Sequence, residues 1–163
     1  MTSSMSAQNF KEIYEKYKNL LFRISFTYLK NSEDTEDILQ EAFIKRVYNA
    51  PVFENEEHEK RWLINVTVNL CKNHVKSFWH RNKTDVEDLT ELAEATQWNL
   101  SSEEKNVFSE VMQLPDKQKI AIYLHYYEGY TCKEIAEMLG SRESTVKMRL
   151  KKGRELLKEN MEV

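Results

Sequence analysis

The side chains best able to do chemistry in this 163-residue chain are basic, and many of them lie in two stretches. Residues 142–158 include seven Lys and Arg against two acidic residues, and residues 61–83 include five Lys and Arg and no acidic residue. Lysine and arginine side chains bind phosphates, and arginine also binds the edge of guanine. The two stretches therefore predict nucleic-acid binding, although the whole chain has a net charge of −3. Either stretch alone is also compatible with a solvated helix face.

The C-terminal basic stretch follows a predicted tight turn between two helices. Thr131 and Glu134 have the spacing of a capping box, so a short helix is expected to begin directly after Thr131. Gly140 can adopt the left-handed conformation that such a turn requires. With Ala136 before it and Val146 after it, the spacing is that of a helix-turn-helix, whose second helix reads DNA.

The second of these helices separates into two sides at about 100° per residue. Its core side is predicted to hold Val146, Leu150, Gly153 and Leu157. The outward side is predicted to contact DNA through short polar, basic and methyl-bearing groups: Ser144, Lys147, Met148, Lys151 and Lys152.

A second polar and basic stripe is predicted on a helix over about 60–78. Its members recur at steps of four, four, three and four residues: Arg61, Asn65, Asn69, Lys72 and Lys76. Trp62, Val66 and Leu70 are predicted to form the buried side of this helix. Asparagine side chains on a basic face, with the aromatic residues 78–80 beside them, suit unpaired DNA bases. Taken alone, this pattern leaves the function open.

The elements that position these stripes are predicted to be helices only. Three glycines and two prolines are too few for a β-rich fold with many turns. Apolar residues at three- and four-residue steps, with breaks between them, predict helices over about 10–28, 32–47 and 60–78. Ser101 with Glu104 resembles a capping box that opens another helix, and a further helix is predicted from about 115 to 127, before the two helices of the helix-turn-helix. Residues 84–100 contain five acidic residues and no basic residue. The predicted fold is therefore all-α, with small helical domains at 1–83 and 101–163 joined by a flexible acidic linker at 84–100.

Other kinds of site find little support in the sequence. Gly-rich phosphate loops, nucleophile elbows and paired-acid motifs do not occur, so we expect no catalytic residues, no cofactor and no enzyme activity of the chain alone. Cys71, His74 and His80 could approach one metal ion, but a fourth ligand is not evident, so no metal site is predicted. The chain has no apolar run of about 20 residues and no apolar segment near its N-terminus. We therefore expect a cytoplasmic protein that does not insert into membranes.

Three motifs in order resemble those of the extracytoplasmic-function (ECF) sigma factors, small two-domain promoter-specificity subunits of bacterial RNA polymerase. The motifs are DTEDILQEAFIKRVY (34–48), RWLINVTVNLCKNHVK (61–76) and LPDKQKIAIYLHYYEGYTCKEIAEMLG (114–140), the last followed by STVKMRL. The resemblance extends from about Phe10 to Leu157.

The resemblance implies a role for each motif. The first would dock on the clamp helices of the largest subunit of the polymerase core, through Asp37, Gln40, Glu41 and Phe43. The second would melt and read the −10 promoter element, with Asn55 in the preceding loop, Val52–Glu59, where the family captures a flipped base. The C-terminal helix would read the −35 element, where Thr145, Arg149 and Arg154 join the residues given above. An anti-sigma factor is an expected partner, and the acidic linker would enter basic channels of the polymerase.

Several residues depart from the family pattern. Gly153 stands where alanine is usual and should cost about 1 kcal/mol of helix stability, which predicts fraying of the −35 helix in the absence of DNA. The loop acids Glu54, Glu56, Glu57 and Glu59 are unfavourable near DNA phosphates. The alternatives to a sigma factor are an autonomous helix-turn-helix transcriptional regulator and a module whose basic faces bind an acidic protein. Neither alternative explains the Asp, Gln and Glu ladder of the first motif.

Overall fold

The computed structural model describes residues 6–78 and 89–161, with only the backbone at 76–78, 90 and 91. The chain divides into two compact units, Met1–Trp98 and Asn99–Val163. Every regular element in the described ranges is helical, which confirms the all-α prediction. The first unit contains α1 (Ala7–Leu29), α2 (Ser32–Tyr48), α3 (Glu56–Phe78) and α4 (Leu89–Ala95). The second contains α5 (Ser102–Met112), α6 (Asp116–Ile122), the π-helical turn η2 (Tyr123–Tyr127), α7 (Cys132–Leu139) and α8 (Glu143–Met161).

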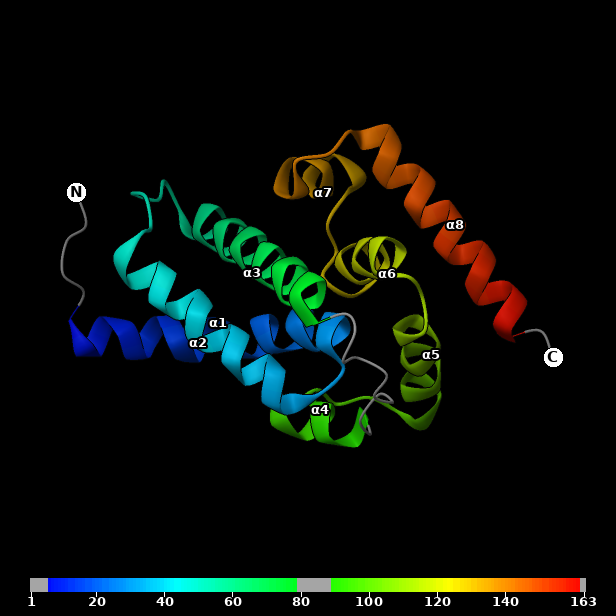
Figure 1. Cartoon of the computed structure of the whole chain (residues 1–163), viewed down its shortest axis with the longest axis horizontal. Helices are drawn as coiled ribbons and strands as arrows, with labels where there is room; N and C mark the ends of the chain where they lie inside the picture. Colours follow the sequence, from blue (N-terminus) through cyan, green and yellow to red (C-terminus); the bar gives the residue numbers. More distant parts are fainter. Residues whose placement is uncertain (1–5, 79–88, 162–163) are drawn as a thin grey trace. The chain divides into compact units, whose positions relative to one another are not determined.

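In the first unit α1, α2 and α3 pack against one another around one apolar core (Figure 1). Leu21, Ile24 and Phe26 of α1 and Ala42 of α2 are fully buried there, and Ile38 of α2 is nearly so. Burial of side chains of this size is the main source of stability for such a bundle.

Two adjacent residues determine where α1 ends and α2 begins. Lys30 adopts a left-handed conformation (φ 65°) after α1. The side chain of Asn31 then accepts a hydrogen bond from the backbone N–H of Asp34 at 2.8 Å, which caps α2.

The buried side of α3 differs from the one predicted. Leu63, Ile64, Thr67, Val68 and Cys71 are completely buried. The predicted core residues Trp62, Val66 and Leu70 are only partly buried. Apolar residues cover more than half of the circumference of this helix, so periodicity alone could not identify the side that faces α1 and α2.

The second half of the predicted linker belongs to the first unit. Residues 84–88 lie outside the described residues, but 89–95 form α4, which packs on α1. Leu92 and Thr96 are 1% exposed. The Arg23 guanidinium on α1 donates to the side-chain oxygen of Thr96 at 3.1 Å and to its backbone carbonyl at 2.8 Å, and lies 4.7 Å from the Trp98 ring centroid. These contacts extend the first unit to Trp98, because they join residues 73 positions apart in the sequence.

In the second unit, the predicted helix starts are confirmed. Ser101 with Glu104, and Thr131 with Glu134, each form both hydrogen bonds of a capping box. Gly140 ends α7 in a left-handed conformation (φ 66°, ψ 37°), and α8 begins three residues later (Figure 1).

Gly153 has a packing role that its helix propensity does not reveal. The residue is buried in α8, and a Cβ atom placed on it would lie 2.9 Å from Cγ1 of Ile122 on α6. The absence of a side chain therefore lets α8 approach α6 closely, and α8 is helical from Glu143 to Met161.

Candidate functional site

The outward face of α8 is exposed over most of its predicted DNA-contacting residues. The exposed members are Ser144, Lys147, Met148, Lys151, Lys152 and Arg154, and the partly exposed members are Thr145 and Arg149. On the opposite side Val146 and Leu150 are at most 2% exposed and Gly153 is buried, whereas Leu157 is partly exposed. The helix thus presents cations and a 70% exposed methionine to solvent, a combination that suits phosphates and thymine methyl groups.

The polar stripe of α3 is accessible where the structure describes it. Asn69 and Lys72 are exposed, and Arg61 and Asn65 are partly so; the side chain of Lys76 lies outside the described part of the chain, as do Trp79 and His80. The side-chain amide of Asn69 donates to Oδ1 of Asn65 at 3.2 Å. Because Trp62, Val66 and Leu70 are partly exposed, apolar surface is available on this helix beside the polar stripe, which the sequence pattern did not reveal.

Asn55 has a structural contact of its own. Its Oδ1 accepts a hydrogen bond from the backbone N–H of His58 at 2.8 Å, at the N-terminus of α3. The side chain is nevertheless exposed. Val52, three residues earlier in the loop expected to capture a base, is 89% exposed.

Most of the acids predicted in the loop are paired, and Glu56, Glu57 and Glu59 lie in the first turn of α3. Glu59 accepts hydrogen bonds from the Tyr17 hydroxyl at 2.9 Å and from the Arg46 guanidinium at 3.0 and 2.6 Å. Arg46 in turn lies 4.9 Å from the Phe53 ring centroid. We call Tyr17, Arg46, Phe53 and Glu59 the Glu59 cluster; it ties the loop to α1, α2 and α3.

The remaining loop acids lie nearer the surface. Glu56 forms an ion pair with Lys16, and Glu57 forms one with Arg61 at 3.1 Å. The negative charge counted in this loop is therefore largely neutralised by bases from α1, α2 and α3.

The Glu59 cluster also changes the acidity of Tyr17. Burial of the phenol, followed by its hydrogen bond to the Glu59 carboxylate, raises the pKa of Tyr17 well above its ordinary value. Both causes favour the neutral phenol, which donates the hydrogen bond.

The outward face of α2 holds the predicted acidic and amide ladder. Asp37, Gln40 and Glu41 are exposed. Phe43 is only 3% exposed, and its ring packs against those of Phe10 and Tyr14 at centroid distances of 6.2 and 5.0 Å. Phe43 therefore supports this face from beneath and is not a surface contact.

Apolar side chains extend this face beyond the residues predicted from the sequence. Ile44 is 55% exposed and Tyr48 is 67% exposed on α2. Their position one and two turns after Gln40 could have indicated them in the sequence.

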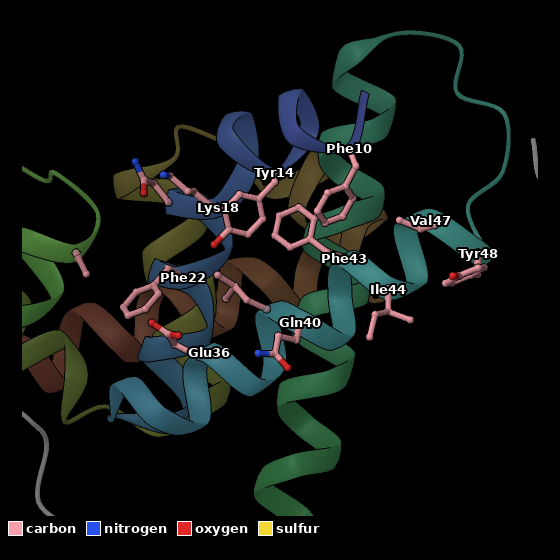
Figure 2. Close-up of a pocket in the computed structure, with 13 residues that line it drawn as sticks. Phe10, Tyr14, Lys18, Phe22, Glu36, Gln40, Phe43, Ile44, Val47 and Tyr48 are labelled. Atoms are coloured by element: carbon pink, nitrogen blue, oxygen red, sulfur yellow. The ribbon is translucent and has the colours of Figure 1, made fainter. Parts of the chain in front are cut away.

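A groove of about 570 Å³ lies between α1 and α2 (Figure 2). The rings of Phe10, Tyr14 and Phe43 gather in it, and Ile44 and Tyr48 line it farther along α2. The other lining residues are Lys18, Asn19, Phe22, Glu36, Leu39, Gln40, Val47 and Ala95. The groove thus adjoins the acidic and amide ladder and shares Gln40 with it.

Two family models match this chain. Sigma-70 region 2 matches residues 13–81, and Sigma-70, region 4 matches residues 106–157. Together they span most of α1 to α3, and α7 with most of α8. The chain belongs to the sigma-70 family of sigma factors.

Similar sequences place this sigma factor in the ECF group. The ECF RNA polymerase sigma factor SigW of Bacillus subtilis is 27% identical over 165 residues, which cover 93% of this chain and 88% of SigW. The ECF RNA polymerase sigma-E factor of Haemophilus influenzae is 28% identical over 166 residues, which cover 94% of this chain and 87% of that protein.

A solved structure shares the fold. It is the sigma factor RpoE in complex with the anti-sigma factor NepR from Bartonella quintana, with a TM-score of 0.67 and 16% sequence identity, covering 96% of this chain and 99% of RpoE. The sigma factor therefore has the fold of known sigma factors.

Metal-binding clusters and membrane spans are not seen in the parts of the sigma factor that the structure describes. Over 6–78 and 89–161, no three His, Cys, Asp or Glu side chains are grouped so that they could hold a metal ion. In the same ranges no helix has the length and apolar character required to cross a membrane. His80, one of the three ligands considered from the sequence, lies outside these ranges.

Proposed function

We propose that this sigma factor directs the core RNA polymerase of a bacterium to specific promoters and promotes the melting of promoter DNA. The observation that carries the proposal is the exposed ladder of Asp37, Gln40 and Glu41 on α2, in a chain whose other unit presents an exposed basic helix in a helix-turn-helix. Carboxylates repel DNA phosphates, so the ladder suits a protein partner. An autonomous regulator has no need of such a surface.

Each surface has a separate task in this proposal. The α2 ladder, with Ile44 and Tyr48 beside it, docks on the clamp helices of the largest polymerase subunit. The exposed stripe of α3 and the loop before it contact the melted −10 strand, where asparagines bind base edges and Trp62 offers a stacking surface. The outward face of α8 reads the −35 element in the major groove.

Regulation and location follow the same proposal. The RpoE structure was solved with an anti-sigma factor, and we propose a partner of this class for the present chain, acting in the cytoplasm. The chain supplies no catalytic groups in this account, because the polymerase performs the chemistry.

The test is transcription from fragmented DNA of the source organism by core polymerase with and without the sigma factor. We expect transcripts that start downstream of two shared sequence motifs only when both components are present. Transcription that the factor leaves unchanged, together with tight sequence-specific binding of the isolated protein to duplex DNA at physiological salt, would favour the autonomous regulator.

A further inference from the structure

A line of cations follows one flank of α8. Lys147, Lys151, Arg154 and Lys158 occur at steps of four, three and four residues, which places them on the same side of the helix over about 16 Å. All four are exposed. Such a line matches a DNA backbone, whose phosphates repeat along a strand, better than a single anion.

A tyrosine from outside the helix-turn-helix joins this line. Nη1 of Arg154 donates a hydrogen bond to the Tyr126 hydroxyl oxygen at 3.1 Å, across 28 residues of sequence. Tyr126 is 53% exposed and comes from η2, the π-helical turn that follows α6.

The local structure of η2 directs Tyr126 outward. Its neighbours Tyr123 and Leu124 are completely buried, and the rings of Tyr123 and Tyr127 stack at 5.7 Å. On the outer side the His125 ring contacts the Tyr126 ring edge-on at 4.8 Å. Single π-helical turns are rare and frequently occur at functional sites, because they re-aim side chains at the cost of regular hydrogen bonding.

The hydrogen bond leaves both groups able to bind a further acceptor. The Tyr126 oxygen accepts from Arg154, so its own O–H proton remains available to donate. The guanidinium keeps other N–H donors, and its charge polarises the hydroxyl to which it is bonded. A tyrosine O–H and an arginine N–H side by side at an exposed position suit one phosphate group.

We propose that Tyr126 is a DNA-backbone contact of this sigma factor and that, with Arg154, it forms a phosphate clamp at the flank of the −35 helix. The inference rests on the proposed binding of duplex DNA by α8. It adds a residue from the preceding turn to that surface, so that the unit binds the phosphates of the −35 region with two elements.

The test is the affinity of the full-length chain for a mixed-sequence 20-base-pair duplex, measured by fluorescence anisotropy from low to moderate salt. We expect Tyr126→Phe to weaken binding about five-fold, the effect of one net hydrogen bond. Arg154→Ala should weaken it further and reduce the slope of log affinity against log salt by about one. The double variant should bind much as Arg154→Ala does, because the two side chains act on one phosphate. Tyr14→Phe, the same change at a tyrosine of the other unit that is 37% exposed, should have no effect.

The outcomes separate the clamp from the proposed function. If Tyr126→Phe binds as the wild type while Arg154→Ala and Lys151→Glu bind weakly, the clamp is refuted and DNA binding by α8 stands. If none of the three α8 and η2 variants changes binding, the proposed DNA surface itself fails. A loss of affinity in Tyr126→Phe that is accompanied by a matching shift of its urea unfolding midpoint would show that the hydroxyl only supports the fold, and would also refute the clamp.

Discussion

The two units of this sigma factor position their functional side chains differently: one uses contacts between residues close in the sequence, and the other uses contacts between residues far apart in it. In the second unit the first helix of the helix-turn-helix, α7, begins at a capping box between residues three apart and ends at one left-handed glycine, Gly140. In the first unit the N-terminus of α3 is held by Glu59, which bonds to Tyr17 and Arg46, 42 and 13 residues away. Short-range rules therefore describe the surface proposed to read duplex DNA, whereas the segment beside the proposed −10 surface depends on which distant residues meet.

This difference changes how charge should be interpreted. Counted along the sequence, the loop acids oppose DNA binding. In the fold Glu56, Glu57 and Glu59 are paired with bases from three helices. The net charge of a short segment is thus a poor guide to the charge that a nucleic acid meets there.

The largest effect is expected from breaking the Glu59 cluster. Glu59→Gln leaves the Arg46 guanidinium, whose side chain is 16% exposed, without its charged partner and should lower the free energy of unfolding of the first unit by about 2–3 kcal/mol. All three tryptophans lie in this unit, so their fluorescence during urea denaturation measures it selectively.

The matched control is Glu57→Gln, two residues before Glu59 in the sequence. This change breaks the more exposed ion pair between Glu57 and Arg61. Its effect should be within about 0.5 kcal/mol. If Glu59→Gln and Glu57→Gln lowered the free energy of unfolding equally, the Glu59 cluster would contribute no more than a surface ion pair.

The Tyr17 phenol gives a second test of the cluster, through pH. The pKa of Tyr17 is raised in the folded state, so the unfolded chain loses this proton first, near pH 10. Its contribution to stability is complete below that pH and is lost as pH rises above it, by up to about 1.4 kcal/mol per pH unit. In Tyr17→Phe, stability of the first unit should fall less steeply between pH 9.5 and 11. Parallel pH profiles for the two proteins would contradict the assigned environment.

In the second unit, Gly153→Ala tests whether close packing outweighs helix propensity. Alanine favours the helix by about 1 kcal/mol, but its Cβ would lie 2.9 Å from Ile122, and overpacking costs about 1–3 kcal/mol. We expect net destabilisation of about 1 kcal/mol by circular dichroism, with tryptophan fluorescence unchanged. Lys152→Ala, at the neighbouring exposed position, should remain near the wild type. If Gly153→Ala were more stable than the wild type, helix propensity would outweigh packing at this position, as predicted from the sequence.

What could be predicted from the sequence follows the same division. The helix-turn-helix, both capping boxes and the core side of α8 at Val146, Leu150 and Gly153 were predictable, because they depend on neighbouring residues. The all-α fold followed from the helical periodicities and the shortage of glycine and proline.

Other features depend on packing between distant residues. Periodicity could not choose the buried side of α3, since Leu63 and Trp62 are both apolar and only contact with α1 and α2 distinguishes them. It also missed α4, whose position depends on Arg23, and the burial of Phe43 beneath the α2 ladder. Tyr126 lacked any sequence signal, because its exposure results from the π-helical turn and its contact with Arg154.

The most direct test of the account is the affinity of labelled full-length protein for core RNA polymerase, compared among three proteins that remain folded by circular dichroism. The double variant Gln40→Ala with Glu41→Ala should bind core at least ten-fold more weakly than the wild type, because it removes the centre of the exposed α2 ladder. Lys151→Glu reverses a charge on the outward face of α8 and should bind core as the wild type does, while −35-dependent transcription is lost. Release from core by Lys151→Glu, or unchanged core affinity of the α2 double variant, would contradict the assignment of these two surfaces.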